Sequence, residues 1–145
     1  HTTAFDMARL AIALRRDFPD YYPVFKLESF TYNGVEYPTH NHVMERYPGA
    51  DGVKTGYIRA SGFNVVTSVR RDGYNLVAVV MGGKTAEARD NQMIGLLDRT
   101  FAQLPTKDNT LARNDISGKK NDFLNGLPSG INQMQAVIPV ALQTF

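Results

Sequence analysis

The stretch from residue 76 to residue 81 constrains the fold more than any other part of this 145-residue sequence. It reads Leu-Val-Ala-Val-Val-Met, so every residue in it is apolar. A short run without a polar side is typical of a strand covered on both faces, because alternate side chains then meet apolar neighbours above and below the sheet. We therefore expect a central strand in a sheet that carries packed helices.

Two further strand-like segments precede this run. Residues 53–58 form a short one, and residues 63–70 form a longer one in which Phe63, Val65, Thr67 and Val69 face one way. Arg71-Asp72-Gly73 supplies a tight turn between the second segment and the apolar run. We expect these last two strands to pair antiparallel.

Two helices flank the strands. Thr3 and Asp6 have the spacing of a capping box, which predicts a helix over residues 4–17 that stops before Pro19. Thr85 can cap a second helix that runs to about Leu104. Apolar residues at helical spacing give the expected buried stripes, which are Met7, Leu10, Ala11 and Leu14 in the first helix and Met93, Ile94, Leu97 and Phe101 in the second.

The remaining segments are turns and a linker. Asn33-Gly34 between residues 30–32 and 35–37 predicts a small hairpin, and residues 38–49 look polar and irregular. From residue 106 onward, Asn, Asp, Lys, Gly and Ser dominate, which indicates a linker or the start of a C-terminal extension over residues 106–145. The predicted fold class is α/β (α+β), an antiparallel sheet covered by helices.

Composition excludes several classes of function. The chain has no cysteine, which rules out disulfides and cysteine-ligated metals. Its net charge is +2 with scattered Lys and Arg, which argues against a nucleic-acid partner. No signal peptide can be read and no apolar run is long enough to cross a membrane. The first residue is His1, not Met, which suggests an interior fragment of a longer chain.

The stretch that carries the most chemical information is Tyr47-Pro48-Gly49-Ala50-Asp51-Gly52-Val53-Lys54-Thr55-Gly56-Tyr57. Lys-Thr-Gly is a signature of serine penicillin-binding proteins and β-lactamases, but a bare tripeptide is weak. Three other segments strengthen it. They are Thr2-Thr3-Ala4-Phe5-Asp6-Met7-Ala8, Ser61-Gly62-Phe63-Asn64, and Val79-Val80-Met81-Gly82-Gly83-Lys84-Thr85 ahead of Arg89.

As a set, these segments resemble the low-molecular-weight penicillin-binding serine D-alanyl-D-alanine carboxypeptidases. The resemblance covers residues 1–105 and implies the C-terminal half of a β-lactamase/transpeptidase-like catalytic domain, incomplete because the N-terminal half is absent. It implies removal of the terminal D-alanine from peptidoglycan stem peptides ending in D-Ala-D-Ala, sensitivity to β-lactam antibiotics, and a periplasmic or cell-envelope location. It leaves open peripheral membrane attachment of the intact protein. Neither a metal nor a cofactor is expected.

The resemblance also implies roles for individual residues. Lys54 and Thr55 help to bind the carboxylate of the terminal D-alanine or of penicillin, and the backbone N–H of Tyr57 is one of two oxyanion donors. Arg89 helps to hold the same carboxylate with its planar guanidinium. Gly56 lets substrate approach the backbone. Strict alternation along a strand would place the Lys54 and Thr55 side chains on opposite faces, so a shared target must sit near the strand edge.

The nucleophile is the missing part. In the family it is the serine of Ser-x-x-Lys, which precedes Lys-Thr-Gly in the chain. The literal match here, Ser117-Gly118-Lys119-Lys120, follows it in a polar stretch, and Ser61-Gly62-Phe63-Asn64 has the wrong spacing for Ser-x-Asn. We therefore expect the nucleophile to lie outside this chain, and the fragment alone to be inactive.

Other interpretations remain open from the sequence. A β-lactamase or a DD-endopeptidase of the same superfamily also carries Lys-Thr-Gly, and a non-catalytic penicillin-binding-like module is a third alternative. His40-Asn41-His42 could present two imidazoles to a metal, but without a nearby third ligand a loop surface is the better interpretation.

Overall fold

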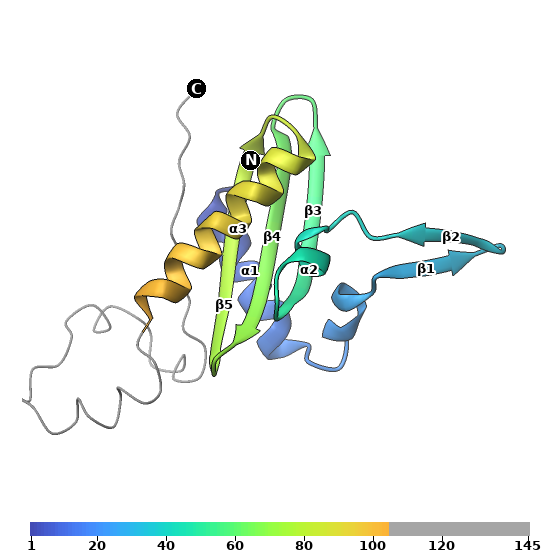
Figure 1. Cartoon of the computed structure of the whole chain (residues 1–145). Coiled ribbons are helices and arrows are strands. Elements are labelled where there is room, and N and C mark those ends of the chain that lie inside the picture. Colours follow the sequence, from blue (N-terminus) through green and yellow to red (C-terminus); the bar gives the residue numbers. More distant parts are fainter. Residues whose placement is uncertain (105–145) are drawn as a thin grey trace, which may run out of the picture.

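The computed structural model describes residues 1–104 of the chain. Figure 1 shows an antiparallel sheet with a long helix on either side of it and a separate hairpin that projects away from the sheet. In chain order the elements are α1 (Ala4–Asp17), the 3₁₀ helix η1 (Tyr22–Lys26), β1 (Ser29–Tyr32), β2 (Val35–Pro38), α2 (Val43–Arg46), β3 (Ala50–Ile58), β4 (Gly62–Arg71), β5 (Tyr74–Gly83) and α3 (Ala86–Gln103).

The three predicted strands form one antiparallel sheet in the order β3-β4-β5. The predicted turn at Asp72-Gly73 is confirmed, and both residues have the positive φ that a tight hairpin turn requires. One expectation is wrong: within the described part of the chain, β4 is the middle strand and the apolar β5 lies at an edge. A continuous apolar run indicates that both faces of a strand are covered, but it does not indicate whether the strand pairs with another strand on each side.

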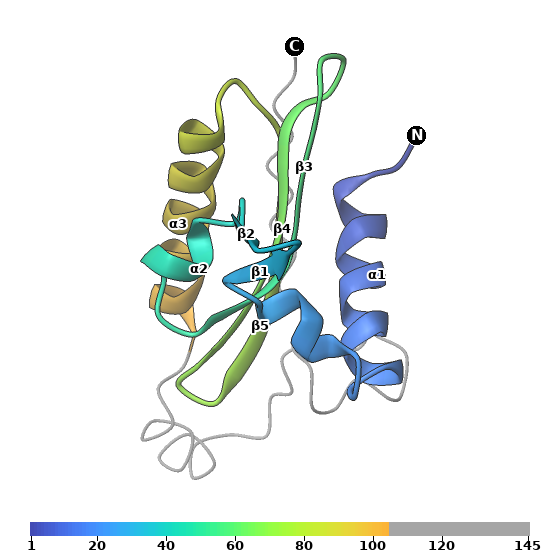
Figure 2. The same ribbon diagram turned by 90° about the vertical axis from the view of Figure 1, so that its right-hand side faces the viewer.

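Figure 2 shows α3 and α2 on one face of the sheet and α1 on the other, and each face has its own hydrophobic core. On one face, α3 packs on β4 and β5 and the short α2 lies against β3 and α3, and this core includes the fully buried Val65, Val80, Met93 and Leu97. On the other face, α1 covers Val66, Val77 and Val79. The apolar residues of β5 are thus divided between two cores, as the run of six predicted.

Both long helices begin where the sequence predicts. The Thr3 hydroxyl accepts from the Asp6 N–H while the Asp6 carboxylate accepts from the Thr3 N–H, and the Thr85 hydroxyl caps α3. The predicted stripe of α1 is partly wrong, because Leu10 is 51% exposed while Ala8, Ala11 and Arg15 are buried. A buried arginine on the sheet side of this helix was not expected from periodicity.

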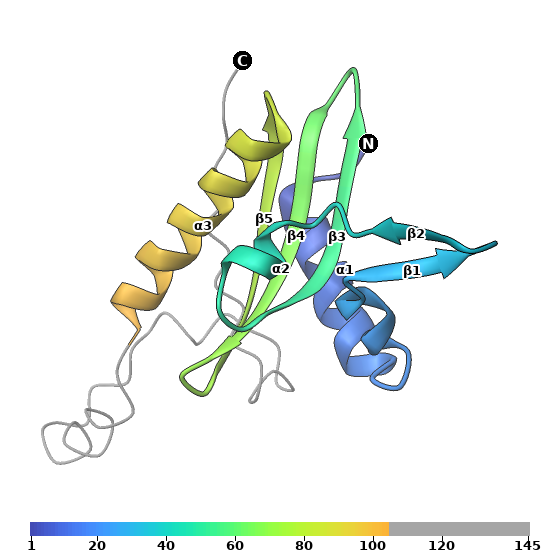
Figure 3. The same cartoon turned by 45° about the vertical axis from the view of Figure 1, so that its right-hand side comes forward.

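The predicted hairpin forms as β1 and β2, with Asn33 and Gly34 at its tip. It stands apart from the main sheet (Figure 3), and the rings of Phe30 and Tyr37 stack across its strands. Two short helices, η1 and α2, lie in segments for which the sequence predicts no element. Each has fewer than six residues, too few for a hydrophobic period to show. The predicted linker at 106–145 and Ser117 lie outside the described residues.

Gly49, just before β3, is a position where only glycine fits. Its φ is +84°, and a Cβ added there would collide with the backbone carbonyl oxygen of Arg70. We expect Gly49→Ala to lower the free energy of unfolding by more than the ~1–2 kcal/mol that a left-handed conformation costs, since the clash adds to the strain. Urea unfolding measures the change.

The matched control is Gly34→Ala at the hairpin tip. Gly34 has a similar φ of +77° but has no atom within 4 Å of the added Cβ, so this variant should show the strain alone. Equal losses for the two variants would contradict the close contact between Gly49 and Arg70.

Candidate active site

The Lys54-Thr55-Gly56 segment lies in β3, whose second edge is unpaired within the described sheet. Lys54 pairs with Val66, which belongs to the core beneath α1, and Thr55 pairs with Val65, which belongs to the core beneath α3. Cross-strand partners point to the same face of a sheet. The two side chains therefore project on opposite faces, as alternation predicts.

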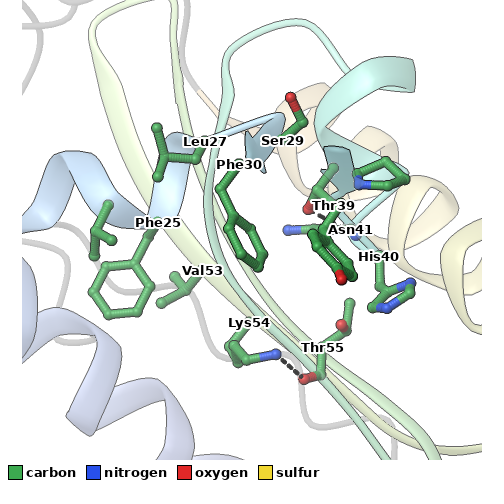
Figure 4. Close-up of a pocket in the computed structure, with 13 residues that line it drawn as sticks. Phe25, Leu27, Ser29, Phe30, Thr39, His40, Asn41, Val53, Lys54 and Thr55 are labelled. Carbon is green, nitrogen blue, oxygen red and sulfur yellow. Dashed lines mark hydrogen bonds between the residues drawn. The ribbon is translucent and has the colours of Figure 1, made fainter. Parts of the chain in front are cut away.

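The Lys54 ammonium reaches the backbone of the next residue in β3. Its side chain is exposed, and Nζ donates to the backbone carbonyl of Thr55 at 2.9 Å (Figure 4). Among residues 1–104, no carboxylate forms an ion pair with Lys54, so within this part of the chain its charge is available to an incoming anion. Figure 4 also shows Lys54 and Thr55 beside a cavity lined by Phe25, Phe30 and Asn41.

All the site residues predicted from the sequence line one cavity of about 420 Å³, which we call the Lys-Thr-Gly cavity. β3 contributes Lys54, Thr55, Gly56 and Tyr57, and α3 contributes Arg89. The remaining lining residues are His40, His42, Phe63 and Ala86. Residues that are 35 positions apart in the sequence thus meet at one site, because the β5–α3 turn returns the chain to the same end of the sheet.

Gly56 and Tyr57 line this cavity near the end of β3. A Cβ on Gly56 would meet nothing within 4 Å, so the backbone of β3 is accessible there. The Tyr57 side chain is 58% exposed and its ring packs on that of Phe63 at 4.3 Å between centroids. This contact holds the tyrosine ring beside the strand end and leaves the backbone at Gly56 uncovered.

Arg89 differs from the other site residues because it is buried. Its side chain is 3% exposed, and its guanidinium forms an ion pair with Asp90 at 2.8 Å. The same guanidinium donates to the backbone carbonyls of Asn64 and His40, each at 3.4 Å. Arg89 therefore ties α3 to β4 and to the loop before α2, and it shares its charge with Asp90.

Sequence reasoning missed the role of Asn64. Its side-chain amide donates to the Ser61 hydroxyl at 3.0 Å and to the backbone carbonyl of Gly56 at 3.3 Å, and its carbonyl oxygen accepts from the Gly82 N–H at 3.0 Å. Asn64 thus links all three strands at the end where β3 turns into β4. The Ser61-to-Asn64 segment was singled out in the sequence, and here it fixes the turn that follows the Lys-Thr-Gly strand.

Two buried phenols have altered acidity. Burial raises the pKa of Tyr22 and of Tyr47 above the ordinary tyrosine value. Both side chains are therefore protonated at neutral pH, and neither is suited to act as a general base there.

Two histidines, His40 and His42, line the cavity. Among residues 1–104, no group of three or more His, Cys, Asp or Glu side chains is arranged to hold a metal ion. His42 instead lies 3.4 Å from the Glu45 carboxylate on the next turn of chain. The helices of this same part of the chain include none that is long and apolar enough to span a membrane.

Comparison with known proteins agrees with this arrangement. The chain is 35% identical over 102 residues to D-alanyl-D-alanine carboxypeptidase DacA and 37% identical over 101 residues to DacC, both from Escherichia coli. These matches cover 70% and 69% of this chain but 25% of each relative, so the chain spans about a quarter of their length. Among solved structures, penicillin-binding protein 5 from Haemophilus influenzae matches with a TM-score of 0.61 and 30% identity, over 67% of this chain and 29% of that one.

The sequence profile of the D-alanyl-D-alanine carboxypeptidases matches residues 1–85, which is more than half of the chain and includes the Lys54-Thr55-Gly56 strand. The matched range includes α1 and all three strands of the main sheet. This chain belongs to the D-alanyl-D-alanine carboxypeptidase family.

Proposed function

We propose that the chain is the substrate-binding part of a serine D-alanyl-D-alanine carboxypeptidase that acts on peptidoglycan stem peptides. The observation that carries the proposal is the Lys-Thr-Gly cavity, where an edge strand of the described sheet, an exposed ammonium and a hydroxyl surround a space large enough for a dipeptide end. An extended peptide can pair with such an edge through its backbone. The membership of the family supports the same substrate class.

In this proposal, the side chains of β3 bind and orient the leaving group. The Lys54 ammonium and the Thr55 hydroxyl hold the terminal carboxylate at the strand edge, where side chains from both faces can reach it. The backbone N–H of Tyr57 donates to the oxyanion that develops on the scissile carbonyl. Arg89 lies in the wall of the cavity and adds positive potential near the carboxylate, while its guanidinium holds the wall in place.

The covalent chemistry belongs to a serine on a polypeptide segment outside these 145 residues. That serine attacks the carbonyl of the penultimate D-alanine, the terminal D-alanine leaves with the proton it gains, and water hydrolyses the resulting ester. A β-lactam acylates the same serine. Such a substrate belongs to the cell envelope, which is where we expect the intact protein to act.

Covalent labelling tests whether the nucleophilic serine lies outside this chain. The 145-residue chain of 16.1 kDa alone should give no labelled band with a fluorescent penicillin on a denaturing gel. The catalytically complete polypeptide, in which this chain follows a segment with Ser-x-x-Lys and Ser-x-Asn, should be labelled and should release D-alanine from a D-Ala-D-Ala peptide.

A labelled band from the chain alone would contradict the proposal, and loss of that band in Ser117→Ala would identify the serine responsible. A complete polypeptide that hydrolyses penicillin rapidly but releases no D-alanine would indicate a β-lactamase. A complete polypeptide that does neither would indicate a binding module.

A further inference from the structure

A buried arginine connects α1 with the beginning of β3. Arg15 lies in the last turn of α1 and is 7% exposed, whereas its neighbour Arg16 is exposed and pairs with Asp17. The Arg15 guanidinium donates to the Asp51 carboxylate and to the Ser68 hydroxyl. A buried guanidinium is tolerated only when charges and acceptors surround it. The contact with the buried Arg15 guanidinium therefore fixes where the Asp51 carboxylate lies.

Three further contacts hold the same part of β3. The Arg15 guanidinium lies over the ring of Tyr22 at 4.4 Å from the centroid, and the Lys26 ammonium lies 3.5 Å from Asp51. The next residue, Gly52, packs so closely against η1 that an added Cβ would lie 3.1 Å from the Tyr22 hydroxyl. Residues 51 and 52 are thus held by two cations and by the η1 helix.

The pairing between β3 and β4 is irregular at these two residues. Ala50 pairs with Val69 and Val53 pairs with Thr67, so three steps along β3 correspond to two steps along β4. One extra residue is accommodated on β3, as in a β-bulge. A shift of one residue would move every following side chain to the other face of the sheet. The way residues 51 and 52 are held therefore decides which faces Lys54 and Thr55 occupy.

We infer that Arg15 is a positioning residue for the Lys-Thr-Gly strand, acting through Asp51. It holds the irregular start of β3 so that Lys54, three residues further along, lies at the strand edge with its ammonium directed to the cavity. The inference rests on the proposed function, because the role of Lys54 in binding a carboxylate is part of it. Among the described ion pairs, Asp51 is held from α1 by Arg15 and from η1 by the half-exposed Lys26, and of these two cations Arg15 is the buried one.

A double-mutant cycle in the catalytically complete polypeptide tests the inference. Arg15→Met should lower the second-order rate constant of acylation by a fluorescent penicillin about 10- to 100-fold, the effect expected when a binding group is displaced by about 1 Å. In a Lys54→Ala background, the same substitution should change the rate less than about 2-fold, because Arg15 acts through Lys54. Arg16→Met is the matched control and should leave the rate unchanged. A loss of equal size in both backgrounds would show a general structural effect and overturn the inference.

A second variant covers the case in which Arg15→Met does not fold. Arg15→Lys keeps the charge but presents a single ammonium in place of the guanidinium fork, so it should retain an intermediate rate. Backbone amide chemical shifts provide a measurement that does not depend on catalysis. Arg15→Lys should change the amide shifts of residues 53–57 more than those of β5. Unchanged amides at 53–57 would overturn the positioning role. By contrast, a wild-type polypeptide that is never acylated would show that the proposed function itself is wrong.

Discussion

Replacing Lys54 with alanine in the catalytically complete polypeptide is expected to slow acylation by penicillin and hydrolysis of a D-Ala-D-Ala peptide by about 100-fold or more. The loss of one preorganised donor at a site of developing or bound negative charge has effects of about this size. The Lys54 ammonium is exposed at the cavity, and among residues 1–104 it bonds the Thr55 carbonyl, so its removal leaves no buried group of this part of the chain unpaired. The variant should therefore retain the stability of the parent protein.

Two comparison variants separate the effect of the Lys54 ammonium from the effect of removing a surface charge. Lys84→Ala removes another exposed lysine, from the turn between β5 and α3, which does not line the Lys-Thr-Gly cavity, and should leave both rates unchanged. Lys54→Arg retains the charge on a larger, planar group and should recover part of the rate. The measurements are stopped-flow acylation and D-alanine release at a single pH. A Lys54→Ala variant that is acylated as fast as the parent would show that the Lys54 ammonium does not contribute to the site.

The helix start and the two hairpin turns could be predicted because residues close to them in the sequence determine them. Thr3 with Asp6 marks the start of α1, Asn33-Gly34 forms the hairpin tip, and Asp72-Gly73 forms the turn between β4 and β5. Each signal lies within four residues of the structure that it specifies, and each depends on backbone capping or on positive φ. Side-chain contacts elsewhere in the molecule do not change these preferences.

The start of β3 could not be predicted for the opposite reason. Residues 50–52, Ala-Asp-Gly, have the composition of a loop, yet β3 begins at Ala50, which pairs with Val69, and Asp51 bonds Arg15, which lies 36 positions earlier. Periodicity in α1 likewise favours Leu10 as a buried residue, although it is half exposed. Helical spacing identifies an apolar stripe, but which residues of a helix face the sheet depends on what the sheet presents to them.

The candidate site was recognised from the resemblance of its motifs, and the structure adds what these motifs do not contain. The sequence predicts Arg89 as a carboxylate ligand, but the adjacent Asp90 gave no sign that the two would form a buried ion pair. A direct contact between Arg89 and a substrate carboxylate stays a prediction. Its test must separate a contribution to binding from a contribution to folding, because the guanidinium also holds two backbone carbonyls.

Arg89→Met is expected to lower the free energy of unfolding by about 3–5 kcal/mol, since it leaves the Asp90 carboxylate buried without its partner. Asp90 is 1% exposed and Arg89 is 2% exposed, so water cannot replace the lost ion pair without opening the wall of the cavity. The double variant Arg89→Met/Asp90→Leu removes both charges and should recover much of that loss. Urea unfolding of the single and double variants measures the difference, and equal stability of the two would contradict a buried, mutually dependent pair.

The double variant then makes the binding role of Arg89 measurable in a folded protein. If Arg89 adds positive potential at the terminal carboxylate, kcat/KM should fall more for a peptide that ends in a free carboxylate than for the same peptide amidated at its end. Lys54→Ala provides the reference for complete loss of the preference for the free carboxylate over the amide. Equal losses on the two peptides would mean that Arg89 does not act on the carboxylate. Its place in the Lys-Thr-Gly cavity would then be explained by the carbonyls of Asn64 and His40, which it holds against α3.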